Sequence, residues 1–218
     1  MKTFPHLAKI LLWFSAAVAA GAFAFVVALT FVVSFFREVE ISAWNVVASH
    51  IGPWFLLWVG VYAIHNVLPI AVAHGRTRRD FLASTSVLAV LLALAGTALA
   101  WLGYLLEGGI YGLMGWTADE HGAVPAYFFM YLVWFVTGAL CAAAFGRFGP
   151  GGVFVLPVAF AFIALTRAQI PGSGTLPFIP DVPGLLGPGW YGVSAAAFAI
   201  ALAGTWAVVR DMPVRVRG

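Results

Sequence analysis

The chain has 218 residues, of which 63% are hydrophobic and only 9% are charged, and its mean hydropathy is +1.00. Soluble domains carry about 25% charged residues, so this composition excludes a water-soluble protein. The net charge of +3 follows from the membrane topology predicted below and does not indicate nucleic-acid binding.

The apolar residues form long uninterrupted runs, and a run of about 18 or more residues is long enough to cross a bilayer as a helix. We predict an all-α integral membrane protein with a single transmembrane domain over residues 1–218. About six transmembrane helices are expected, at residues 10–36, 51–73, 81–106, 125–144, 152–166 and 190–209.

Two of these spans have features that also fit another interpretation. The first resembles a signal peptide with small residues at 20–22, but its apolar run continues to Phe36, well beyond the length of a signal peptide core. The fifth is short and contains Pro157, yet Arg147 and Arg167 flank it and their long side chains can reach the two interfaces. Both segments are therefore interpreted as spans.

The basic residues predict the orientation, because cytoplasmic loops collect Lys and Arg. Most of the 11 lie on one predicted side: Lys2, Lys9, Arg76, Arg78, Arg79, Arg147, Arg210, Arg215 and Arg217. The other side receives Arg37, Arg167 and most acidic residues, namely Glu38, Glu40, Glu107, Asp119, Glu120 and Asp181. We expect a multi-pass protein of the plasma (inner) membrane with both termini in the cytoplasm.

The external segment at residues 169–189 is rich in Pro and Gly but also contains apolar residues such as Leu176, Phe178 and Ile179. Turn-forming residues mixed with apolar ones are compatible with a segment that dips into the membrane. We predict a short re-entrant segment before the last helix. An ordinary surface loop remains the alternative.

The short cytoplasmic connection at residues 74–81 has the clearest local signals. Gly75 is suited to the left-handed conformation that ends a helix, and His74 suits the negative end of the helix dipole. Thr77 and Asp80 have the spacing of a capping box before the next apolar run. We predict a stiff turn whose arginines, Arg76, Arg78 and Arg79, face the cytoplasm. Basic loop residues that contact lipid phosphates are the simpler interpretation.

The same turn carries a family pattern, Gly-x-[ST]-Arg-[RK]-x-Phe, in the residues Gly75, Arg76, Thr77, Arg78, Arg79, Asp80 and Phe81. In this pattern, and in its place between the second and third of six spans, the chain resembles the permease subunits of bacterial ABC-type exporters of the type-2 class. The likeness extends to Glu107, just after the third span, and to the Pro/Gly-rich external segment before the sixth. Many relatives begin with a longer amphipathic helix, which the short stretch before residue 10 does not match.

The resemblance implies a half-transporter that pairs with a second permease chain, as a homodimer or heterodimer, and with separate P-loop ATPase subunits. The turn would dock on the ATPase and couple it to the permease. The only lysines, Lys2 and Lys9, lie outside any Gly-Lys-[ST] pattern, so ATP is expected on the partner subunit. We expect no cofactor and no catalytic residue in this chain itself.

Polar residues inside the bilayer are candidates for function. The second span contains His65 and Asn66, followed by Pro69, and with Glu107 these polar residues form a candidate translocation path. Hydrogen bonding between helices, worth about 0.6 kcal/mol on average, is the structural alternative.

The sequence supports other functions less well than an exporter. An intramembrane enzyme would need paired catalytic residues in the spans, and neither a His-Glu-x-x-His motif nor a convincing serine nucleophile occurs, since Ser173 lies between glycines in a loop. Haem ligation by histidine is disfavoured because the histidines are scattered. A membrane partner subunit of the immunity or sensor type, or a secondary transporter, remains the alternative.

Overall fold

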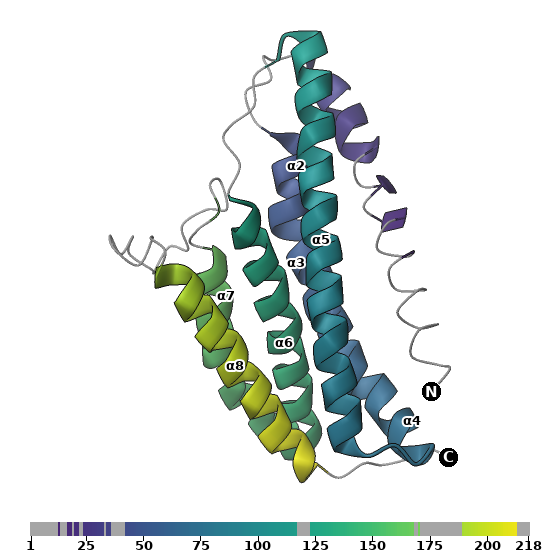
Figure 1. Ribbon diagram of the computed structural model, residues 1–218, viewed down its shortest axis with the longest axis vertical. Coiled ribbons are helices and arrows are strands. Elements are labelled where there is room, and N and C mark those ends of the chain that lie inside the picture. Colours follow the sequence, from purple (N-terminus) through teal and green to yellow (C-terminus); the bar gives the residue numbers. More distant parts are fainter. Residues whose placement is uncertain are drawn as a thin grey trace.

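The computed structural model describes residues 42–116, 123–167, 170 and 189–212, together with some positions between 13 and 35. The elements in the described part are helices, arranged side by side along the long axis of the molecule (Figure 1). In chain order they are α2 (Ala43–Val46), η1 (Val47–Ile51), α3 (Gly52–Tyr62), η2 (Ala63–Val67), α4 (Leu68–Ala73), α5 (Arg78–Met114), α6 (Val124–Phe148), η3 (Gly149–Val155), α7 (Leu156–Arg167) and α8 (Gly189–Arg210).

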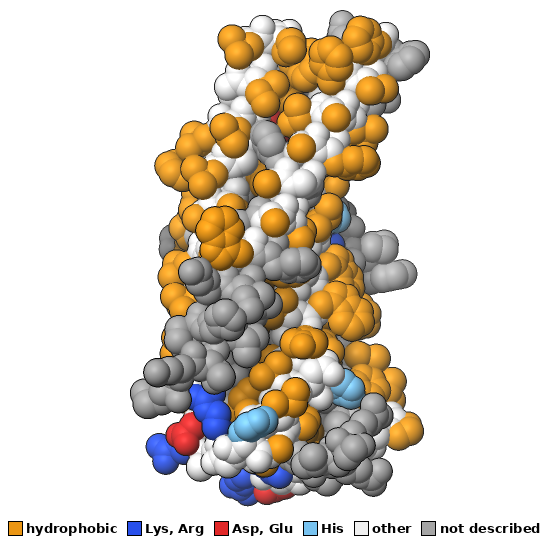
Figure 2. Space-filling model, turned by 90° about the vertical axis from the view of Figure 1, so that its right-hand side faces the viewer, with side chains coloured by type: hydrophobic (Ala, Val, Ile, Leu, Met, Phe, Trp, Pro, Cys, Tyr) orange, Lys and Arg blue, Asp and Glu red, His pale blue; other side chains and the backbone are white. Residues whose placement is uncertain are grey.

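Four helical stretches in the described part are long and apolar enough to cross a membrane: Ala43–Ala73, Arg78–Met114, Val124–Arg167 and Gly189–Arg210. On the face shown in Figure 2, hydrophobic side chains cover much of the surface, and most of the visible charged side chains gather at one end of the bundle. The all-helical fold is confirmed for the described residues, and the four apolar stretches indicate a membrane-embedded protein.

The stretch Ala43–Ala73 is continuous but contains two π-helical segments, η1 and η2. Each segment ends two residues before a proline, Pro53 or Pro69. A proline has no N–H to donate and its ring clashes with the carbonyl four residues earlier. Widening the preceding turn relieves that clash, so the helix passes both prolines without ending.

Helix α5 is longer than the span predicted at 81–106. It has 37 residues and ends at Gly115, whose φ of 70° is left-handed. Its length of about 55 Å exceeds the roughly 30 Å of the hydrocarbon core. The predicted span ends at residue 106, but Glu107 and Tyr111 are buried against the start of α2 and hold the last turns of α5 in a helix.

A sharp turn at Gly149, with φ 57° and ψ −131°, divides the stretch Val124–Arg167 into α6 and α7. Helix α7, preceded by the 3-10 segment η3, folds back along α6 (Figure 1). The fourth and fifth predicted spans thus correspond to α6 and to η3 with α7. The sixth, 190–209, corresponds to α8.

Helix α6 is the centre of the bundle and packs against α3, α5, α7 and α8. Its contact with α3 is close enough that a Cβ atom at Gly60 would collide with the Phe135 carbonyl oxygen, and one at Gly138 with the Leu57 carbonyl oxygen. Small residues at such crossings let helix backbones approach in membranes. The predicted re-entrant segment, 169–189, lies outside the described residues except for Ile170 and Gly189. In the first predicted span, 10–36, the described positions include a continuous helical stretch at 24–32, and the remaining positions lie outside the described residues.

Candidate functional site

The turn at residues 74–81 begins with a Schellman motif at the end of α4. Gly75 has a φ of 78°, its N–H donates to the Val72 carbonyl at 2.9 Å, and the Arg76 N–H donates to the Ala71 carbonyl at 3.0 Å. These bonds satisfy carbonyls that the helix end leaves open. The predicted role of Gly75 in ending the helix is confirmed.

Helix α5 begins with an N-cap, as the sequence predicted. The Thr77 hydroxyl oxygen accepts the Asp80 N–H at 3.1 Å, and the hydroxyl donates to the Asp80 carboxylate at 2.7 Å. The carboxylate therefore bonds the Thr77 side chain where the usual capping box bonds the backbone N–H. Because Gly75 and Thr77 are separated by one residue, the chain has almost no slack between α4 and α5.

The turn is also fastened to helices α6 and α8. Phe81 is buried in a cluster formed by residues of η2, α4, α5, α6 and α8, which includes Leu68, Ala143 and Val209. Arg78 donates from Nη1 to the carbonyl oxygens of Val209 at 2.8 Å and Arg210 at 2.6 Å. The half-buried guanidinium of Arg78 thus caps α8, a contact that the sequence did not predict.

A second arginine ties the neighbouring helix end. Arg147, in the last turn of α6, donates to the Ala207 carbonyl at 3.2 Å and lies 3.4 Å from the Asp211 carboxylate. Cationic side chains near helix C-termini are favourable because the carbonyl dipoles point there. The sequence did not reveal this arrangement, since Arg147 was interpreted only as a flanking residue.

The outer surface of the turn is the part that another molecule can contact. Arg79 and Asp80 are exposed, Arg76 is half-buried, and their side chains make no ion pair with other described residues. A guanidinium in such a position can bind a carboxylate with two parallel hydrogen bonds. The turn therefore combines a rigid attachment to the bundle with a small charged outer face.

The candidate path residue Glu107 lies at the other end of the bundle. It is only 4% exposed, and its carboxylate accepts the Ser42 hydroxyl at 2.6 Å and the Trp44 N–H at 2.8 Å. A carboxylate at the first turn of α2 is stabilised by the positive end of the helix dipole, and it accepts a hydrogen bond from an N–H that has no partner within the helix. Glu107 is thus engaged in holding α2 against α5.

A polar network that sequence reasoning missed lies beside Glu107. The Tyr104 hydroxyl donates to the Asn45 side-chain oxygen at 2.9 Å and lies 2.6 Å from the Tyr127 hydroxyl. Tyr104, Glu107 and Tyr111 are three and four residues apart, so they share one face of α5. That spacing was visible in the sequence and would have indicated a polar stripe on an otherwise apolar helix.

The other two candidate path residues do not lie with Glu107. His65 and Asn66 belong to η2 and are exposed on the outside of the bundle. About twenty helical residues, or roughly 30 Å at 1.5 Å per residue, separate them from Ser42 and Trp44, which bond Glu107. Within the described part of the chain these three residues form no common path.

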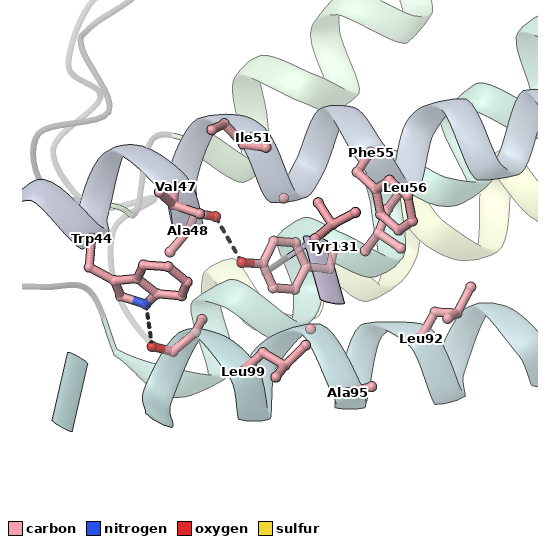
Figure 3. A pocket seen from close by; sticks show the side chains of 14 residues that line it. Trp44, Val47, Ala48, Ile51, Phe55, Leu56, Leu92, Ala95, Leu99 and Tyr131 are labelled. Atoms are coloured by element: carbon pink, nitrogen blue, oxygen red, sulfur yellow. Dashed lines mark hydrogen bonds between the residues drawn. The ribbon is translucent and has the colours of Figure 1, made fainter. Parts of the chain in front are cut away.

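A small cavity lies between the helix Ala43–Ala73 and α5, with Tyr131 of α6 pointing into it (Figure 3). Tyr131 donates to the Ala48 carbonyl at 2.8 Å, and Trp44 donates to the Ala100 carbonyl at 2.8 Å. The cavity is almost entirely apolar and measures about 70 Å³, roughly half of the 150 Å³ that suffice for benzene.

Comparisons of the sequence and the structure with protein-family models, curated proteins and solved structures found no match.

Proposed function

We propose that the chain is the permease subunit of an ATP-driven exporter in the plasma membrane. It crosses the membrane six times with both termini in the cytoplasm, and it pairs with a second permease chain. A separate P-loop ATPase contacts the turn at residues 74–81 and couples ATP hydrolysis to transport. The re-entrant segment at 169–189 belongs to the same proposal. ATP is bound and hydrolysed by the partner subunit, so the chain is not itself an enzyme.

The attachment of the turn is the observation that supports this function best. The turn is capped on both sides by Gly75 and Thr77, anchored by Phe81 and bonded to α8 by Arg78. A force on its outer face therefore moves α4, α5 and α8 together, because packed helices transmit strain with little compression. An ordinary loop that only follows the positive-inside rule needs no such attachment.

The proposed path for substrate lies outside the single bundle. The described interior is filled by apolar side chains around α6, and the cavity at Tyr131 is small. Six largely apolar helices suit an amphipathic or apolar substrate, since a charged one would require compensating charges within the spans. The path is therefore formed between permease chains or by movement of the helices.

The first test is affinity purification of the tagged chain from its native membranes in mild detergent, with mass spectrometry of what accompanies it. A P-loop ATPase in near-equal amount is the expected result. The chain purified alone, or with a receptor or an electron carrier, would contradict the proposal and favour a partner subunit of another kind.

The second test separates coupling from folding. Arg79→Glu reverses a charge on the exposed face of the turn, and it should reduce transport-linked ATPase activity while the amount and thermal stability of the chain stay unchanged. Arg217→Glu makes the same charge change outside the turn and is the matched control. Equal activity of the two variants would count against docking at the turn.

A further inference from the structure

The outward face of the helix Ala43–Ala73 carries a stripe of exposed side chains, formed by Trp58, Tyr62, His65, Asn66 and Ile70. Trp58 is 64% and Tyr62 53% exposed, and His65 and Asn66 are exposed between them and Ile70. Trp58, Tyr62, Asn66 and Ile70 follow one another at intervals of four residues. His65 comes three residues after Tyr62, so the set lies along one side of the helix. We call this set the outer stripe.

The polar part of the outer stripe lies deep in the membrane. Ala73 ends the helix next to the charged turn, and His65 is eight residues earlier, which is about 12 Å at 1.5 Å per residue. The hydrocarbon core is roughly 30 Å thick, so His65 and Asn66 lie near its middle. Trp and Tyr favour the membrane interfaces, which makes Tyr62 at this depth unusual as well.

These polar groups have no partner in the described part of the chain. No hydrogen bond joins the side chains of Tyr62, His65 or Asn66 to another described residue. Pro69 also brings no N–H to this turn, which removes one donor for the backbone carbonyls beside His65. Lipid tails offer no hydrogen bonds, and each polar group left unsatisfied in hydrocarbon costs several kcal/mol.

We propose that the outer stripe is the surface on which a second copy of this chain packs, with His65 and Asn66 hydrogen-bonded across the interface. This inference rests on the proposed function, which calls for a second permease chain, and it names both that partner and the face that binds it. Helices in membranes associate through close packing and through polar side chains such as Asn and His.

The depth and chemistry of the two residues favour a second copy over another partner. Two copies inserted with the same orientation bring His65 and Asn66 to the same depth without further adjustment. Each side chain carries both a donor and an acceptor, so a two-fold interface, in which the same patch faces itself, can satisfy both copies at once. An unrelated helix would need suitable polar groups at that depth.

Disulfide cross-linking in native membranes tests the interface. The single native cysteine, Cys141, is replaced by serine, and cysteine is introduced by Tyr62→Cys or Asn66→Cys. A disulfide forms only when Cα atoms come within about 7 Å, so both variants should give several-fold more covalent dimer on oxidation than Val87→Cys. Val87 is the matched control, because it is 54% exposed and lies at a similar depth on α5.

A second measurement tests the hydrogen bonds themselves. Asn66→Leu should raise the dimer dissociation constant in detergent by about three- to sixteen-fold, which corresponds to the 0.6–1.7 kcal/mol measured for interhelical hydrogen bonds. Asn66→Gln, which keeps a donor and an acceptor, should change it less. Light scattering of the purified chain reports the mass of the particle.

Four outcomes would overturn the interface: equal cross-linking at Val87 and Asn66, cross-linking only at Val87, a chain that stays monomeric in every variant, or a monomeric Asn66→Cys variant that reacts with a membrane-impermeant thiol reagent. The last would indicate a water-lined path at this helix. Cross-linking through the outer stripe without any co-purifying ATPase would support this interface while contradicting the proposed function. An ATPase partner without cross-linking would do the reverse.

Discussion

Arg78 caps the last turn of α8, because its Nη1 atom donates to the carbonyl oxygens of Val209 at 2.8 Å and of Arg210 at 2.6 Å. The first residue of α5 is thereby fixed to a helix that ends more than a hundred residues later in the chain. Its neighbour Arg79 points outward. Two adjacent arginines of one motif therefore have different physical roles.

The difference between these arginines predicts different effects on stability. Arg78→Ala removes hydrogen bonds from a charged donor to two carbonyls, and we expect a loss of about 1–3 kcal/mol. Arg79→Ala removes an exposed side chain and should change stability by less than about 0.5 kcal/mol. Thermal unfolding of the two variants in the same detergent measures the difference, and equal melting temperatures would contradict the capping role.

Glu107 should be important for stability at the opposite end. Glu107→Ala leaves the buried Ser42 hydroxyl and Trp44 N–H without their acceptor, which should cost about 1–3 kcal/mol or more. Glu107→Gln keeps the shape and one acceptor oxygen, so a smaller loss is expected. Thermal unfolding in detergent distinguishes these variants. An alanine variant as stable as the parent chain would show that the carboxylate does not hold α2.

The helices and the local geometry of the turn were predictable because the signals for both are local. Apolar runs indicated helices within a few residues of α6 and α8, and Gly75 and Thr77 indicated the caps of the turn. The long continuation of α5 was missed, because glycines indicate loops and only the distant contact of Glu107 with Trp44 stabilises the helix there.

The placement of polar side chains could not be predicted from a single span. Whether His65 and Asn66 face the bundle or its outside depends on which side of the helix packs on α6, and the π-helical turn η2 rotates the following residues relative to an ideal helix. The partner of Arg78 likewise depends on where α8 ends. Such contacts are set by tertiary packing, so only the residue types were visible in the sequence.

The predicted orientation can be measured by cysteine labelling in a Cys141→Ser background. Arg79→Cys is expected to react with a membrane-impermeant reagent only in inside-out vesicles, because the predicted topology places the basic turn in the cytoplasm. Leu113 lies near the far end of α5 and is 89% exposed, so Leu113→Cys should react only in intact cells. Leu113 is a better site than the neighbouring Gly115, because the left-handed φ of Gly115 disfavours a side chain. Labelling of both ends from one side would refute the topology.

The crossing of α3 and α6 should tolerate no side chain. A Cβ atom at Gly60 or at Gly138 would meet backbone of the facing helix, and backbone cannot rotate away as a side chain can. Gly60→Ala and Gly138→Ala should therefore separate the helices, with a loss of about 1–3 kcal/mol of stability, typical of overpacking, and a larger loss for leucine.

Gly108→Ala is the matched control, since nothing lies within 4 Å of its added Cβ and alanine is about 1 kcal/mol better than glycine in a helix. The measurement is membrane yield together with thermal unfolding, and a Gly60→Ala variant as stable as Gly108→Ala would contradict the close approach of the two helices.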